Sequence, residues 1–218
     1  MVLGGLTAAS ARPVGAGGAS PALQRLRAAI WIACLLPLAR LVWLGLNDGL
    51  GANPIEFISR STGTWTLVIL LATLCVTPLR QLTGWTELVR VRRLLGLFTF
   101  FYVCLHFVNW IVVDQFFDWP AMIKDIAKRP FITVGFAGFM LLLPLALTST
   151  DAMRRRLKRN WGRLHKVVYA VPVLGVLHYW WLVKKGVQTP LPYTVAVVVL
   201  LGWRAAAWWR QRVASAVR

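Results

Sequence analysis

The stretch RRLLGLFTFFYVCLHFVNWIVV, residues 92–113, is the clearest guide to the class of structure. After its two arginines, residues 94–113 contain no acid and no further Lys or Arg, and His106 is their only basic side chain. An α-helix crosses a bilayer core of about 30 Å with about 20 residues, because each residue adds about 1.5 Å. Residues 94–113 are therefore predicted to form a transmembrane helix.

The rest of the chain has the same character. Further apolar segments occupy residues 28–46, 64–79, 131–148, 164–183 and 192–209. Charged residues make up only 15% of the chain, against about a quarter in soluble domains. The sequence thus predicts an all-α bundle of six transmembrane helices within 28–210, with a flexible tail at 1–27 and a short tail at 211–218. We expect the second helix to end at Thr77 and Pro78.

The basic residues are concentrated in alternate connections. The chain has 25 Lys+Arg against 7 Asp+Glu, a net charge of +18. The tails and the connections after the second and fourth segments hold most of this charge, on Arg12, Arg25, Arg27, Arg80, Arg90, Arg92, Arg93, Arg154, Arg155, Arg156, Lys158, Arg159, Arg163, Lys166, Arg204, Arg210, Arg212 and Arg218. The opposite connections hold most of the acids, at Asp48, Glu56, Asp114, Asp118 and Asp125. The positive-inside rule then predicts that both termini are cytoplasmic. Because this charge follows membrane topology, no nucleic-acid partner is predicted.

All three histidines lie on the third and fifth predicted helices. At about 1.5 Å per residue, His106 is about 18 Å from the cytoplasmic edge, and His178 lies about 20 Å beyond His165. His106 and His178 therefore reach a similar depth on two different helices. Ionisable groups inside a membrane are costly, and a pair of imidazoles is able to hold haem iron from opposite faces. The alternative is that each histidine only hydrogen-bonds a neighbouring helix.

His165 is a less certain ligand of a second haem, because it lies at the cytoplasmic edge. Thirteen residues at about 100° each leave His165 and His178 about 140° apart on a straight helix. Both side chains face one bundle interior only if the helix bends or unwinds, and Pro172 lies between them. The sequence leaves one haem or two.

Other residues complete the predicted haem environment. We expect Arg40, in the outer half of the first helix, to pair with a haem propionate, or otherwise to reach the interface or a loop acid. Gly135 and Gly138 make room either for a porphyrin or for close helix packing. The expected apolar walls are Phe98, Phe101, Phe107, Trp110 and Tyr179. The cysteines Cys34, Cys75 and Cys104 show no metal-ligand or disulfide spacing, and no nucleotide-binding or protease motif occurs.

Four segments resemble the MsrQ family, formerly YedZ, the haem-binding membrane subunit of the periplasmic protein-methionine-sulfoxide reductase system. They are TGTWTLVILLATLCVTPLR (62–80), RRLLGLFTFFYVCLHF (92–107), RPFITVGFAGFMLLLPLALTST (129–150) and WGRLHKVVYAVPVLGVLHYWW (161–181). The likeness covers about residues 28–210. The family belongs to the ferric-reductase-like transmembrane group, which includes the membrane part of NADPH oxidases. Those oxidases carry two histidines on each equivalent helix, whereas this chain has only His106 on the third.

The resemblance implies a multi-pass protein of the bacterial inner membrane with haem b, and also FMN. The family's histidines correspond to His106, His165 and His178. The resemblance further implies electron transfer from quinol of the quinone pool to a heterodimeric partner, a periplasmic molybdopterin reductase of the MsrP type that repairs oxidised envelope proteins. Because only residues 210–218 follow the last predicted helix, we expect no flavin or nicotinamide domain here. The chain is then an electron-transfer subunit rather than the catalytic one, with membrane lipid around it.

Two alternatives belong to other functional classes. The first is a stand-alone transmembrane reductase of ferric ion or another small acceptor, supplied by a separate cytoplasmic flavin reductase. The second is a membrane anchor or assembly subunit without redox chemistry, in which the histidines only pack. An optical spectrum separates the second alternative from the others, because a chain without haem has no Soret band.

Overall fold

The computed structural model describes residues 19–183 and 190–216, and every regular element in these ranges is helical. The first part of the predicted N-terminal tail (1–18), Lys184, Lys185 and residues 217–218 lie outside the described residues. The helices are α1 (Pro21–Leu46), α2 (Pro54–Thr83), α3 (Arg92–Val108), α4 (Trp119–Lys128), α5 (Pro130–Leu147), α6 (Asp151–Leu157), α7 (Arg159–His165), α8 (Ala170–Leu182) and α9 (Leu191–Ala216). The 3-10 helices η1 (Thr86–Val91) and η3 (Lys166–Tyr169) and the π-helix η2 (Asn109–Asp114) connect some of them.

Five helices of the described residues are long and apolar enough to cross a membrane, namely Pro21–Leu46, Pro54–Thr83, Thr86–Asp114, Pro130–Leu147 and Leu191–Ser215. They correspond to five of the six predicted segments. The remaining prediction, 164–183, is also helical but is divided among α7, η3 and α8, and α8 has only 13 residues. Large apolar side chains such as Leu36 and Val198 are more than 60% exposed. An apolar surface of this extent is typical of a protein surrounded by lipid.

Two helix boundaries differ from the predictions. α1 begins at Pro21 rather than at residue 28, since Pro21 occupies the first turn and the Ser20 side chain accepts a hydrogen bond from the Leu23 amide. The prediction that the second helix ends at Thr77 and Pro78 is wrong, because α2 continues to Thr83.

A neighbouring helix explains why Pro78 does not end α2. Proline lacks the amide that would donate to the Leu74 carbonyl one turn earlier. Nη2 of Arg204, on α9, donates to that carbonyl at 2.9 Å. Transmembrane helices tolerate proline where a neighbour bonds the freed backbone group in this way.

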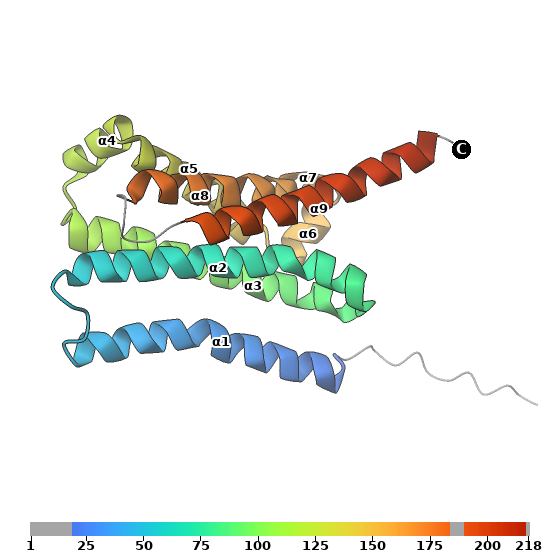
Figure 1. Ribbon diagram of the computed structural model, residues 1–218, viewed down its shortest axis with the longest axis horizontal. Helices are drawn as coiled ribbons and strands as arrows, with labels where there is room; N and C mark the ends of the chain where they lie inside the picture. Colours follow the sequence, from blue (N-terminus) through green and yellow to red (C-terminus); the bar gives the residue numbers. More distant parts are fainter. Residues whose placement is uncertain (1–18, 184–189, 217–218) are drawn as a thin grey trace, which may run out of the picture.

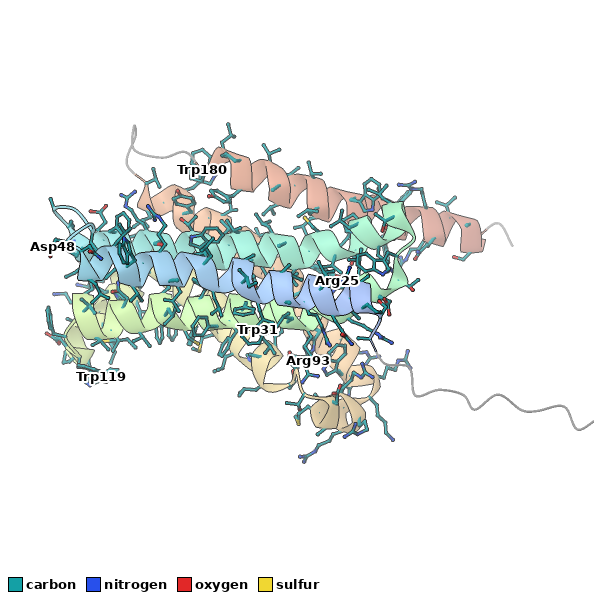
Figure 2. The ribbon with its side chains drawn as sticks, turned by 90° about the horizontal axis from the view of Figure 1, so that it is seen from below. Arg25, Trp31, Asp48, Arg93, Trp119 and Trp180 are labelled. Atoms are coloured by element: carbon teal, nitrogen blue, oxygen red, sulfur yellow. The ribbon has the colours of Figure 1, made fainter. Side chains whose placement is uncertain are left out.

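The helices form an elongated bundle, with α2 packed most extensively on α3, and α5 on α8 (Figure 1). α1 lies along the outside of α2, and α9 crosses both α2 and α8. The start of α1, the α2–α3 connection, α6 and the end of α9 lie at one end of the bundle (Figure 1). Figure 2 shows Arg25 and Arg93 towards this end, and Asp48 and Trp119 at the opposite one. The separation agrees with the predicted charge asymmetry.

The connection 114–130 contains a short helix, α4, that is not one of the predicted apolar segments. α4 begins where the Asp118 side chain accepts a hydrogen bond from the Ala121 amide at 3.0 Å. Its ten residues are too short to cross a bilayer, and Met122 is buried while Ile123 is exposed. This short amphipathic helix leads directly into α5 at Pro130.

Candidate functional site

A cavity of about 390 Å³ lies between α2, α3, α5 and α8. This volume is within the range of small-molecule and cofactor sites, about 300–1,000 Å³. Most of the lining is apolar, and the polar side chains include His106, His178, Arg60, Arg129 and Asp114. Apolar walls with a few convergent polar groups are typical of a cofactor site.

α2 positions His106. The histidine Nδ1 lies 3.0 Å from the Ser59 carbonyl and 3.3 Å from the Thr62 hydroxyl. A carbonyl only accepts, so the bond to Ser59 places the imidazole proton on Nδ1 and leaves a lone pair on Nε2. Gly63 allows this approach, because a Cβ there would lie 3.2 Å from the imidazole Cε1.

α5 positions His178 in the same manner. Its Nδ1 donates to the Phe131 carbonyl at 2.7 Å, which again leaves the lone pair on Nε2. Gly135, one turn further along α5, is closer still, since a Cβ there would lie 2.8 Å from Nδ1. The room that Gly135 provides is thus for the histidine ring. Metal-ligating histidines usually donate their other ring nitrogen to a carbonyl or carboxylate in this way.

The structure brings His106 and His178 together at one depth, in agreement with the helical-rise estimate. Their ring centres are 6.2 Å apart and their planes meet at 82°. Two metal–nitrogen bonds of about 2 Å separate the ligating nitrogens by about 4 Å and the ring centres by about 6 Å. The separation of the two imidazoles therefore fits a pair of histidines that would hold one haem iron between them. Their role as ligands remains a prediction.

His165 does not reach this cavity. Its Nδ1 is 3.1 Å from the Trp161 carbonyl, its ring stacks on the Trp161 ring at 3.9 Å, and its Nε2 is buried. The Leu145 backbone also lies within hydrogen-bonding range of the imidazole. The role of His165 as a ligand of a second haem stays a prediction.

A change of helix type resolves the angular difficulty between His165 and His178. η3 replaces about 100° per residue with about 120°, which over four residues reduces their separation from about 140° to about 60°. Pro172 contributes indirectly, because it has no amide for the Val168 carbonyl, and Val168 belongs to η3. The 3-10 turn before Pro172 therefore brings the two histidines closer to one face of the helix, although only His178 lines the cavity.

Three of the five predicted aromatic wall residues line the cavity, namely Phe107, Trp110 and Tyr179. Phe98 is buried against Trp31 of α1, with ring centres 4.8 Å apart, and Phe101 is 38% exposed. Phe136 and Phe139 of α5, which we did not predict, complete the wall, and Phe139 stacks on Phe107 at 4.4 Å. The spacing of aromatic residues along α3 does not show which face of that helix lies against the cavity and which lies against α1.

The arginine that we expected beside a haem propionate, Arg40, does not line the cavity. Arg40 is exposed on α1, and α1 contributes no residue to the cavity lining. Arg60 and Arg129 line the cavity instead. Each is held by an acid one turn earlier in the chain: Arg60 lies 2.6 Å from Glu56, and Arg129 lies 3.1 Å from Asp125. The i to i+4 spacing of Glu56 and Arg60 was a usable signal in the sequence.

Comparison with known proteins identifies the class first. Residues 62–176, which include His106 and end two residues before His178, match the family "Ferric reductase like transmembrane component". Together with the membrane-length helices, this match defines a multi-pass membrane protein of the ferric-reductase-like class. No solved structure matches the chain.

Relatives then identify the particular family. The chain is 53% identical over 196 residues to the protein-methionine-sulfoxide reductase heme-binding subunit MsrQ of Bordetella pertussis, covering 89% of this chain and 95% of that one. It is 56% identical over 190 residues to the protein of the same name from Ralstonia nicotianae, covering 86% and 87%. With the corresponding protein of Xanthomonas euvesicatoria the identity is 50% over 178 residues, covering 79% and 82%. The chain belongs to the MsrQ family.

Proposed function

We propose that this chain is a haem-containing electron-transfer subunit of the bacterial inner membrane. It takes electrons from the quinone pool and delivers them to a periplasmic molybdopterin methionine-sulfoxide reductase of the MsrP type, for the repair of oxidised envelope proteins. The observation that carries the proposal is the facing pair His106 and His178, with ring centres 6.2 Å apart in a cofactor-sized cavity. The names of the relatives, which describe heme-binding subunits of a methionine-sulfoxide reductase, support it.

The residues of the cavity have distinct roles in this proposal. Hydrogen bonds to the Ser59 and Phe131 carbonyls orient His106 and His178 so that each Nε2 is available to iron. The two imidazoles would hold the haem iron from both sides, which would leave no position on the iron for substrate. Haem b held in this way supplies a one-electron carrier that changes between ferric and ferrous states. The aromatic walls keep water away from the site.

The proposed topology has six spans with both termini in the cytoplasm. The helical stretch from Arg159 to Leu182 supplies the sixth, in spite of its internal 3-10 turn. The arginine-rich connections at one end of the bundle support this orientation (Figure 2). The cavity includes Asp114 and Arg129, at the end that carries α4, so the site lies towards the periplasm and its partner.

The proposal has two further parts. A second haem at His165 is supported by the family resemblance, in which the histidines correspond to His106, His165 and His178. The FMN implied by the same resemblance stays a prediction.

We expect Arg60→Gln and Arg129→Gln each to release haem about tenfold faster, because a guanidinium that pairs with a propionate makes charge-assisted hydrogen bonds. Both arginines line the cavity. The measurement is haem transfer from the purified protein to an excess of apomyoglobin, followed optically. Arg40→Gln is the matched control, since Arg40 lies outside the cavity lining. Equal release by all three variants would show that no cavity arginine holds the propionates.

The proposed function is tested with purified protein in nanodiscs. We expect a quinol, added without oxygen, to raise the absorbance of reduced haem, and the MsrP-type partner with a methionine-sulfoxide substrate to lower it again. If no quinol changes the absorbance, the proposal that quinol donates the electrons is wrong. If ferric citrate reoxidises the sample as fast as the partner does, a stand-alone ferric reductase becomes the better proposal. A protein without a Soret band would overturn both.

A further inference from the structure

A second polar cluster lies between α2, α3 and α9, where two arginines meet at one hydroxyl. Nη2 of Arg204 is 3.1 Å from Oγ1 of Thr77, and Nη2 of Arg92 donates to the same oxygen. We call Arg92 and Arg204 the Thr77 arginine pair. The pair lies near the cytoplasmic ends of these helices in the proposed topology, away from the cavity that holds His106 and His178.

No carboxylate neutralises the Thr77 arginine pair within the described residues. The ion pairs there are Arg60–Glu56, Arg90–Glu87, Arg93–Asp151 and Arg129–Asp125. All seven acids of the chain fall inside the described ranges, and none of them pairs with Arg92 or Arg204. Two like charges that converge in a partly buried place repel each other and lose hydration, unless an anion joins them.

Both guanidinium groups also have unused donors. Nε of Arg92 and Nη1 of Arg204 are buried and have no hydrogen-bond partner among the described residues. The Tyr169 ring lies 5.0 Å from the Arg204 guanidinium carbon and covers one face of it, but a ring face accepts no ordinary hydrogen bond. Buried donors are normally paired, so these two free donors leave the cluster around Thr77 short of an acceptor.

We propose that the Thr77 arginine pair binds a phosphate group at the cytoplasmic side of the bundle. The guanidinium fork matches the oxygens of phosphate, and a basic pocket between transmembrane helices on this side is a usual place for an anionic lipid headgroup. The phosphate belongs either to an anionic phospholipid or to a water-soluble phosphate compound. The site does not depend on haem, because none of its residues lines the haem cavity.

The test compares two phosphate sources on the purified full chain. Native mass spectrometry measures binding of phosphatidylglycerol against phosphatidylcholine, and thermal unfolding measures stabilisation by inorganic phosphate against chloride. If the bound phosphate belongs to a lipid, we expect the protein to bind phosphatidylglycerol in preference to phosphatidylcholine. If it belongs to a water-soluble compound, we expect inorganic phosphate to raise the unfolding temperature more than chloride does. Arg92→Gln should weaken the preferred interaction about tenfold. Arg212→Gln is the matched control and should change nothing, since Arg212 is an exposed residue of α9 that lies 4.0 Å from the Trp208 ring centre.

A second substitution guards against mere misfolding. Arg204→Lys keeps the positive charge and is expected to retain most of the selectivity, whereas Arg204→Gln should lose it. Equal binding of both lipids together with no effect of inorganic phosphate would overturn the proposal. The proposal also fails if Arg92→Gln lowers stability but leaves the lipid preference and the response to phosphate unchanged, or if it removes haem absorbance while both lipids bind equally.

Discussion

His178→Ala and His106→Ala are each expected to abolish the low-spin haem spectrum of the purified protein. Each variant removes one of the two imidazoles that face each other with ring centres 6.2 Å apart. An iron with a single strong axial ligand is no longer low-spin, and haem retention falls as well. The measurement is the optical spectrum of oxidised and dithionite-reduced protein, with the haem content determined on the same sample.

His165→Ala is the control for this experiment. Its ring stacks on Trp161 and is outside the cavity lining, so the signal of the His106–His178 site should persist. With a second haem bound at His165, the variant loses only that part of the absorbance. Full low-spin spectra in both His106→Ala and His178→Ala would show that other residues bind the iron.

Gly135→Ala is expected to damage the site almost as severely, although alanine is usually the better helix residue. The added Cβ would lie 2.8 Å from Nδ1 of His178 and 3.0 Å from its Cε1, so the ring must move. Movement breaks the 2.7 Å bond to the Phe131 carbonyl, and loss of such an orienting bond typically weakens metal affinity about 10–100-fold. The measurement is the haem-to-protein ratio after purification, together with haem transfer to apomyoglobin.

Gly202→Ala provides the matched control on α9. Its added Cβ would meet nothing within 4 Å, so the substitution should keep haem and stabilise the helix by about 0.5–1 kcal/mol. If Gly135→Ala binds haem as tightly as the unchanged protein, the close approach of α5 does not position His178.

Much of the architecture was predictable because hydrophobic length and charge are local properties. An apolar run of about 20 residues satisfies its backbone only as a helix in lipid. Arginine-rich connections orient such helices without reference to their packing. The common depth of His106 and His178 followed from helical rise alone, and the structure brings these two rings together.

The predictions that failed concern helix geometry that depends on a neighbouring helix or on a local change of helix type. Pro78 predicted a helix end, but Arg204 bonds the Leu74 carbonyl that proline leaves without a donor. Ideal 3-10 geometry over η3 would reduce the angular separation of His165 and His178 to about 60°, a change that the periodicity of an ideal α-helix does not predict.

The sequence alone therefore located the apolar segments, five of which are membrane-length helices in the structure, and the pair of histidines at one depth. The sidedness of these segments stays a prediction. Which helices surround that pair, and which arginines lie beside it, depended on three-dimensional packing. Arg40 lies within the first apolar segment and Arg60 just before the second, yet only Arg60 lines the cavity, because α2 rather than α1 packs against α3 at His106. The rotation of a helix about its axis and the identity of its neighbours depend on side chains that are distant in sequence. A local sequence pattern therefore does not predict them.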